Sequence, residues 1–220
     1  MTNQEFSDAF DVAVQAYNPH IQFDEYEKSV FLTKAQNIIV QNLYTGQNIR
    51  QESFEQSEEL RRKLSNLIVS TQGTEQHLSS EGINKKSKIF ELPGDIMYII
   101  QEYLELEDSD CISEIEVVPV TYDEYNRIIK NPFKGINNYR ALRLDIDNKT
   151  VDIISTYSNY SYWIKYLKNP SPIVLIDLEG VSINNQTNKT ECELSEVLHE
   201  DILELAVKLA IASRGVQQST

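Results

Sequence analysis

Apolar residues at helical spacing dominate the first seventy positions of the chain. In three segments there, apolar side chains recur three or four residues apart, so a helix would present each set on one face. Each segment also opens with a residue pair typical of a capping box, namely Thr2 and Glu5, Asp24 and Glu27, and Ser53 and Gln56. The pattern predicts an N-terminal part of three helices over residues 1–70.

A polar stretch over residues 71–87 contains two glycines and shows neither helical nor strand periodicity. Such a composition is typical of a loop. We therefore expect a flexible loop here, between the helical part and the rest of the chain.

Strand signals fill residues 88–190, where β-branched and aromatic residues run between turn-forming residues. Two hairpins are predicted, with strand pairs at 97–106 and 111–120 and at 139–146 and 150–155, and two further strands at 161–168 and 172–178. Between the hairpins, Thr121 and Glu124 predict a capped helix from Tyr122 to Lys130. The body should consist of short antiparallel strands interrupted by one helix.

The last segment, residues 191–220, contains a helix whose apolar side chains exceed a single face. One stripe consists of Leu194, Leu198, Ile202, Leu205, Leu209 and Ala212, and Val197, Leu203, Val207 and Ile211 widen it. A helix this apolar needs partners, and we expect it to pack on the N-terminal helices, with Leu205 and Leu209 in the packed face. The predicted fold class is α+β.

Acidic residues outnumber basic ones, with 34 Asp and Glu against 20 Lys and Arg and a formal net charge of −14. This balance argues against a nucleic-acid clamp, which draws its affinity from Lys and Arg, and against binding to an anionic membrane surface. Only Cys111 and Cys192 are present, too few for a disulfide framework. We expect a soluble protein of a reducing compartment.

Catalytic motifs are absent from the sequence, and we expect no cofactor and no metal site. His199 has no second histidine at helical spacing, so a surface helix histidine is the expected role. Asp145, Asp147 and Asp152 could bind a divalent cation, which leaves a metal-dependent hydrolase or nuclease as one alternative, although a tight turn also explains Asp145 and Asp147.

Aromatic residues cluster at Tyr157, Tyr160, Tyr162, Trp163 and Tyr166. They could line a glycan-binding surface, which is a second alternative function. On a strand, however, Tyr162 and Tyr166 would face one side and Trp163 the other, as in a sheet with one packed face. Core or protein interface is the favoured interpretation.

Charge is segregated between two adjacent stretches. Residues 96–120 carry seven acidic and no basic side chains, whereas residues 121–150 carry six basic and four acidic ones. The segregation fits either a solvated acidic hairpin beside a neutralising helix or a head-to-tail interface between copies of the chain. The interface candidates are Glu102, Glu105, Glu114, Glu116, Arg127, Lys130, Lys134, Trp163, Tyr166, Leu205 and Leu209.

Several segments together resemble a known family. They are FLTKAQNIIVQNLYTG (31–46), FEQSEELRRKLSNLIV (54–69), LPGDIMYI (92–99), PVTYDEYNRIIKNPF (119–133), YWIKYLKNPSPIVLI (162–176) and LHEDILELAVKLAIASR (198–214). In these segments the chain resembles the ring or adaptor proteins at the neck of crAss-like tailed bacteriophages. They cover most of the chain, and each is a structural motif without a catalytic fingerprint.

The resemblance implies a non-enzymatic virion protein, assembled in the cytoplasm of the bacterial host. It implies a closed ring of identical copies that joins the portal protein to the tail. Expected partners are copies of the chain itself, the portal protein and other neck or tail ring proteins. The resemblance also implies passing contact with packaged DNA in the channel, and no membrane.

Overall fold

The computed structural model describes residues 1–47, 53–55, 57–76, 87–106 and 114–215. The chain forms two compact units, a helical unit of Met1–Leu67 and Asn169–Thr220, and a sheet unit of Ile68–Lys168. Helices and strands are both abundant, and the α+β prediction is confirmed. The boundaries predicted at residues 70 and 190 differ from those of the two units, which lie at Leu67/Ile68 and Lys168/Asn169. The first strand starts at Ile68, and residues 169–190 belong to the helical unit.

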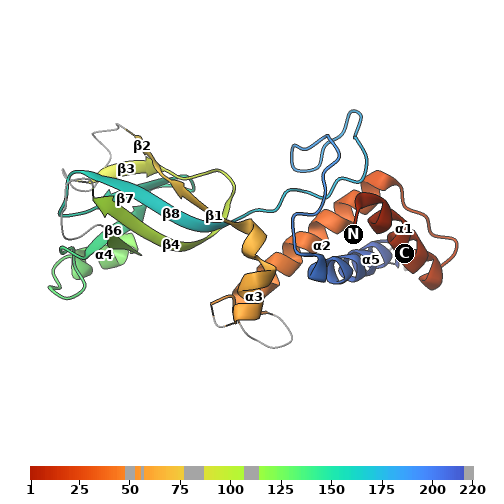
Figure 1. Ribbon diagram of the computed structural model, residues 1–220, viewed down its shortest axis with the longest axis horizontal. Coiled ribbons are helices and arrows are strands. Elements are labelled where there is room, and N and C mark those ends of the chain that lie inside the picture. The colour runs from red at the N-terminus through yellow and green to blue at the C-terminus, as the bar shows by residue number, and fades with distance from the viewer. Residues whose placement is uncertain (48–52, 56, 77–86, 107–113, 216–220) are drawn as a thin grey trace. The chain divides into compact units, whose positions relative to one another are not determined.

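The helical unit gathers elements from both ends of the chain (Figure 1). Its elements are α1 (Asn3–Tyr17), α2 (Glu25–Thr45), α3 (Glu58–Lys63), the 3-10 turns η1 (Ser65–Leu67) and η2 (Glu196–Leu198), and α5 (His199–Gly215). Helix α5 packs on α1 and α2, as predicted for the C-terminal helix. Its buried face includes Ile202, Ala206 and Ala210, while Leu205 and Leu209 are only half-buried.

Two of the three helix starts predicted from capping residues are confirmed. Thr2 and Asp24 each form the complete capping box, and Gly46 ends α2 in the left-handed conformation with φ 80°. The third start is wrong, because α3 begins only at Glu58, and Gln56 lies outside the described residues. Phe54 is instead buried, with its ring 5.5 Å from that of Tyr44 and its backbone N–H bonded to the Tyr44 carbonyl.

The segment predicted as a strand at 172–178 is extended but joins no sheet, so that prediction is wrong. It lies along α2, where helix side chains take the place of a partner strand. Ser29 Oγ accepts from Leu175 N (3.0 Å), Thr33 Oγ1 accepts from Ile173 N (3.1 Å), and Gln36 Nε2 donates to Ser171 O (2.8 Å). Helical spacing on α2 matches every second residue of the extended segment, so alternate backbone groups find partners on the helix, while Val174 exchanges two backbone hydrogen bonds with Thr190 on the other side.

The sheet unit contains one eight-stranded sheet in the order β1-β8-β4-β5-β6-β7-β3-β2. The strands are β1 (Ile68–Gln72), β2 (Thr74–Gln76), β3 (Lys88–Glu91), β4 (Ile96–Leu106), β5 (Glu114–Pro119), β6 (Arg140–Asp145), β7 (Thr150–Ile154) and β8 (Tyr160–Lys168). The two end strands, β1 and β2, are separated in the chain only by Gly73. The sheet therefore curls round and closes on itself at this glycine.

Both predicted hairpins are present, since β4 pairs with β5 and β6 with β7 in antiparallel register. The expectation of antiparallel strands throughout is wrong at one place, where β5 and β6 run parallel. The cause is α4 (Tyr122–Ile128), the predicted helix, which carries the chain back from the end of β5 to the start of β6. Thr121 precedes it without the side-chain hydrogen bond of the predicted capping box.

Residues 71–72 and 74–76, predicted as part of a flexible loop, belong to strands β1 and β2. Their polar side chains gave no strand signal, but their backbone pairs with β8 and β3. Residues 77–86 of the predicted loop lie outside the described residues.

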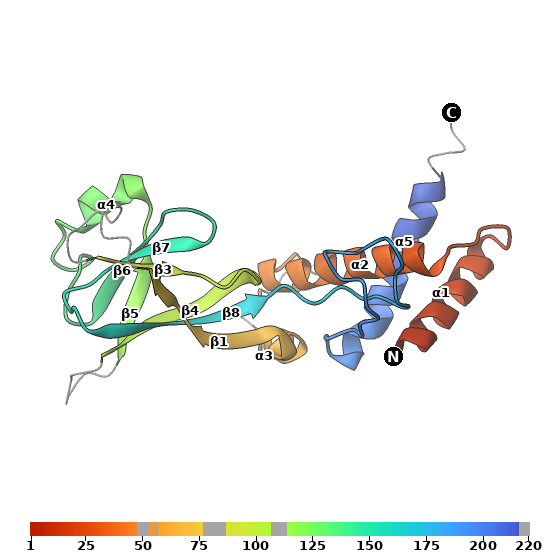
Figure 2. The same cartoon turned by 90° about the horizontal axis from the view of Figure 1, so that it is seen from above.

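Alternate strand residues fill the interior of the closed sheet. The inward side chains include Phe90, Leu104, Ile115, Ile153 and Tyr162, each at most 2% exposed. The opposite face of β6 and β7 is covered by α4 (Figure 2), through a second cluster of Tyr125, Leu142, Leu144 and Ile154. Strand β6 is consequently buried on both faces.

Substituting Gly73 tests the closure of the sheet. A Cβ at Gly73 would lie 2.7 Å from Cδ1 of the buried Tyr162 ring, which has no room to move. Gly73→Ala should lower the free energy of unfolding by roughly 1 to 3 kcal/mol. Gly94→Ala is the matched control, because nothing lies within 4 Å of its added Cβ. Chemical denaturation measures both variants, and equal stability of the two would contradict the close approach.

Candidate functional site

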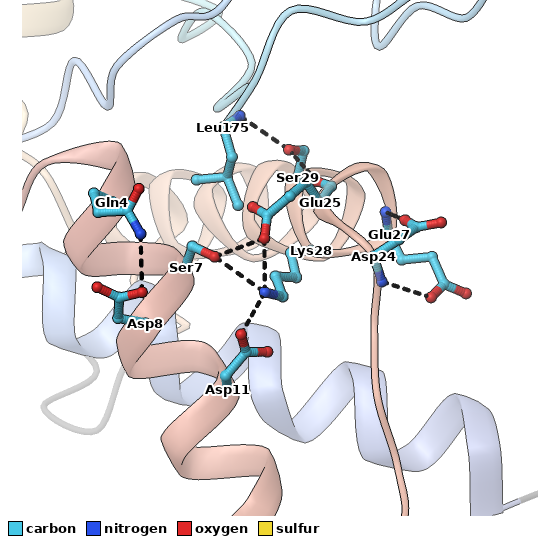
Figure 3. A network of polar contacts seen from close by, with 10 residues as sticks. All are labelled: Gln4, Ser7, Asp8, Asp11, Asp24, Glu25, Glu27, Lys28, Ser29 and Leu175. Atoms are coloured by element: carbon cyan, nitrogen blue, oxygen red, sulfur yellow. Dashed lines mark hydrogen bonds and ion pairs between the residues drawn. The ribbon is translucent and has the colours of Figure 1, made fainter.

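A buried lysine ties α1 to α2 in the helical unit (Figure 3). The side chain of Lys28 is 3% exposed, and its Nζ donates to Asp11 Oδ2 (2.7 Å), Glu25 Oε1 (2.8 Å) and Ser7 Oγ (3.0 Å). Ser7 Oγ in turn donates to Glu25 Oε1 (2.8 Å). Sequence reasoning did not identify this network, because Lys28 occupies an ordinary position among polar residues of a helix.

The charge state of Lys28 follows from this surrounding. Burial alone lowers the pKa of Lys28, but the hydrogen bonds and charges of Asp11 and Glu25 outweigh it and raise the pKa above its usual value. The amine therefore stays charged at neutral pH and acts as a fixed link between the two helices.

His199 is buried, with 5% exposure, so the prediction of a surface histidine is wrong. Its Nδ1 lies 2.6 Å from the Met1 amine, its Nε2 lies 3.1 Å from Leu194 O, and its ring is 5.2 Å from that of Phe6. The contact with α1 explains the burial. Burial also lowers the pKa of His199, which favours the neutral ring.

A second buried ion pair lies inside the sheet unit. Arg143 Nη1 is 2.7 Å from Glu102 Oε2, and the Tyr162 hydroxyl donates to the other Glu102 oxygen. Both charged side chains are at most 10% exposed. Burial, reinforced by Glu102, raises the pKa of Tyr162. Glu102 is thus satisfied within the chain, and its inclusion among the exposed interface candidates is corrected.

The three candidate metal-binding aspartates have separate structural roles. Asp145 pairs with Arg143 Nε at 3.1 Å, and Asp147 Oδ1 accepts from Lys149 N in the turn between β6 and β7. Asp152 is buried in β7. Within the part of the chain that the structure describes, no three His, Cys, Asp or Glu residues group as metal ligands would.

The aromatic cluster divides between the interior and the surface. Tyr160, Tyr162 and Tyr166 are buried, so they cannot form a solvent-facing glycan site, and Tyr166 is an interior residue whose hydroxyl bonds to Asp95 at 3.0 Å. Trp163 lies on the outer side, stacked on Tyr103 at an interplanar angle of 7°. Its Nε1 donates to Glu105 Oε2 at 2.7 Å.

The remaining charged candidates lie on the surface of the sheet unit. Glu105, Glu114 and Glu116 are exposed on β4 and β5, and Glu105 stands directly opposite Glu114 in the strand register. Arg127, Lys130 and Lys134 are exposed on α4 and the segment that follows it. Their contacts with a partner remain predictions.

Leu205 borders a groove of the helical unit with a volume of about 390 Å³. Its lining includes charged residues, and the apolar part of the lining consists of Ile39, Leu43, Leu60 and Leu205. Half-burial leaves Leu205 and Leu209 partly accessible, so their role as interface residues also remains a prediction. None of the helices described is both long and apolar enough to cross a bilayer.

Removing the Lys28 amine tests the buried network. Lys28→Ala leaves Asp11 and Glu25 without their cation and should lower the free energy of unfolding by roughly 2 to 3 kcal/mol. The loss is smaller than for a fully buried ion pair because both carboxylates are partly exposed. Lys34→Ala, at an exposed position of the same helix, should change stability by less than about 0.5 kcal/mol. Similar losses in both variants by chemical denaturation would refute the assignment.

The buried His199 predicts an acid-sensitive stability. A histidine with a lowered folded pKa binds protons more readily in the unfolded chain, so stability falls as the pH drops below the ordinary value of 6.5. One such histidine lowers the free energy of unfolding by at most about 1.4 kcal/mol per pH unit. Chemical denaturation between pH 7.5 and pH 5 should show that the free energy of unfolding of His199→Gln depends less on pH than that of the wild type. His20→Gln, at an exposed position, is the control and should keep the wild-type pH dependence.

Known proteins match the chain along its length. Residues 1–220 match the family described as phage tail ring protein 3/4. Ring protein 3 of Bacteroides phage crAss001 is 44% identical over 222 residues, covering 97% of this chain and 96% of that protein. Ring protein 4/5 of the same phage is 33% identical over 227 residues, covering 97% and 93%. The chain therefore belongs to the phage tail ring protein 3/4 family and is a ring protein of the crAss-like phages.

Proposed function

We propose that copies of this chain form a closed ring in the neck of a crAss-like phage particle, between the portal protein and the tail. The observation that carries the proposal is the match to the ring protein family over residues 1–220, together with two relatives that are named ring proteins. The ring joins neighbouring rings of the neck or tail, and its work is assembly without catalysis.

The two-unit construction supports this role. Each unit has its own buried core and its own polar network, so each can hold its shape while it binds a different neighbour. A ring protein needs surfaces toward the copies on both sides and toward the rings above and below. Several modest contacts of this kind become strong when the ring closes.

The acidic character of the chain suits a channel through which DNA passes. With a net charge of −14, the wall would offer few cations to neutralise phosphates, so DNA would pass without being retained. The inner surface in this proposal makes passing contact with the packaged genome only.

The alternative functions gain no support from the described residues. The hydrolase hypothesis requires Asp145, Asp147 and Asp152 to act together, but they serve an ion pair, a turn and a buried strand position. The glycan-binding hypothesis requires tyrosines that are buried in the sheet unit.

Electron microscopy of purified particles tests the proposed ring. We expect density for this chain as a closed ring between portal and tail, and particles made without the chain should accumulate as heads that lack attached tails. The same particles complemented with the wild-type chain serve as the control. Absence of the chain from complete particles, or its location in the capsid shell, would overturn the proposal.

A further inference from the structure

Three exposed aromatic side chains lie on one stretch of the sheet unit. Tyr122 is 51% exposed, Phe133 86% and Tyr139 71%, all between the start of α4 and the start of β6. Sequence reasoning overlooked them, because aromatic residues are usually buried. Large apolar groups exposed at three places in one stretch of chain make that stretch a candidate interaction surface.

Side-chain hydrogen bonds fix the shape of this stretch. Asn131 Oδ1 accepts from Phe133 N at 2.9 Å and from Lys134 N at 3.3 Å, and Asn137 Oδ1 accepts from Tyr139 N at 2.8 Å. Arg140 Nη1 donates to Phe133 O at 3.2 Å. Phe133 and Tyr139 therefore project from ordered turns, and little backbone conformational entropy remains to be lost on binding.

Basic side chains accompany the aromatic ones. Arg127 is exposed on α4, where it pairs with Glu124 at 3.1 Å, and Lys130 and Lys134 are exposed in the segment that follows the helix, beside Phe133. We refer to Tyr122, Arg127, Lys130, Phe133, Lys134 and Tyr139 as the basic aromatic platform. A surface of this composition suits a partner that offers carboxylates together with aromatic faces.

The outer face of β4, β5 and β8 offers that chemistry. Glu105 and Glu114 stand opposite each other, and Glu116 stands opposite Tyr103, on which Trp163 is stacked. Glu116 lies 3.9 Å from Arg140 and is still largely exposed. Two carboxylates directly opposite one another repel in the free chain, and a cation brought by a partner would relieve the repulsion. We refer to Tyr103, Glu105, Glu114, Glu116 and Trp163 as the acidic face.

We infer that the basic aromatic platform of one copy docks on the acidic face of a second copy. The inference rests on the proposed ring and names the contact that builds it. Complementary charge argues for this occupant, and the aromatic side chains on both surfaces supply the desolvated centre. The two surfaces differ, so the contact is heterologous and leads from copy to copy around a ring.

Charge exchange between the two surfaces tests the inference in assembled particles. The variants are Lys130→Glu with Lys134→Glu, Glu114→Lys with Glu116→Lys, and a chain that carries all four changes. Each is supplied as the sole source of the protein, and copies per particle are measured by quantitative mass spectrometry. Each two-residue variant should lose incorporation about tenfold, because like charges then meet, and the four-residue variant should recover at least half of it.

Controls separate the contact from net charge and from folding. Lys34→Glu with Lys189→Glu changes the net charge by the same amount as Lys130→Glu with Lys134→Glu, but at exposed positions of the helical unit, and should leave incorporation unchanged. Thermal melting of each purified full chain should match wild type. Phe133→Ser with Tyr139→Ser should also lower incorporation about tenfold, since hot spots are typically aromatic.

Distinct results identify which idea fails. If the two charge-reversal variants of the platform and the acidic face incorporate like the wild type, or if the four-residue variant does not recover, docking between copies is overturned while the proposed ring stands. The second result would arise if the platform met another ring protein. Absence of the wild-type chain from particles overturns the proposed ring, and this inference with it.

Discussion

Hydrogen bonds between one face of α2 and the extended segment 171–175 hold the helical unit together. The unit is discontinuous, because the whole sheet unit lies in sequence between Leu67 and Asn169. Ser29, Thr33 and Gln36 satisfy backbone groups that would otherwise be buried without partners. With the returning segment fixed in this way, α5 is placed to bury its apolar face against α1 and α2.

Sequence patterns predicted those features that depend on local interactions. The capping boxes at Thr2 and Asp24 need only residues three positions apart, and the β6–β7 hairpin needs only a turn between neighbouring strands. The segment 172–178 was misassigned because a continuous apolar run indicates burial but does not reveal its partner, which here is a helix. Likewise, the polar residues 71–72 and 74–76 form strands because their backbone groups pair with strands distant in the sequence.

The candidate surfaces were predictable in charge but not in shape. Segregated acidic and basic residues pointed to the two regions of the sheet unit, yet the pattern could not separate Glu102, which points inward to Arg143, from the exposed Glu114. Period-two alternation predicts that successive side chains of a strand point to opposite faces. Which face is the interior, and therefore whether Glu102 or Glu114 is buried, is decided only when the sheet closes. Exposure of Phe133 depends on turns built by Asn131, whose hydrogen bonds only the folded chain displays.

The way the chain enters and leaves the sheet unit makes that unit a modular insert. Strands β1 and β8 are antiparallel neighbours with Ile68 opposite Leu167, so the two crossings from the helical unit lie side by side. A short hairpin could bridge the same two points, since closing a loop depends mainly on how near its ends are. Insertions within residues 68–168 would therefore enlarge the sheet unit while the helical unit keeps its chain path. Such an arrangement lets related ring proteins diverge in one unit at little cost to the other.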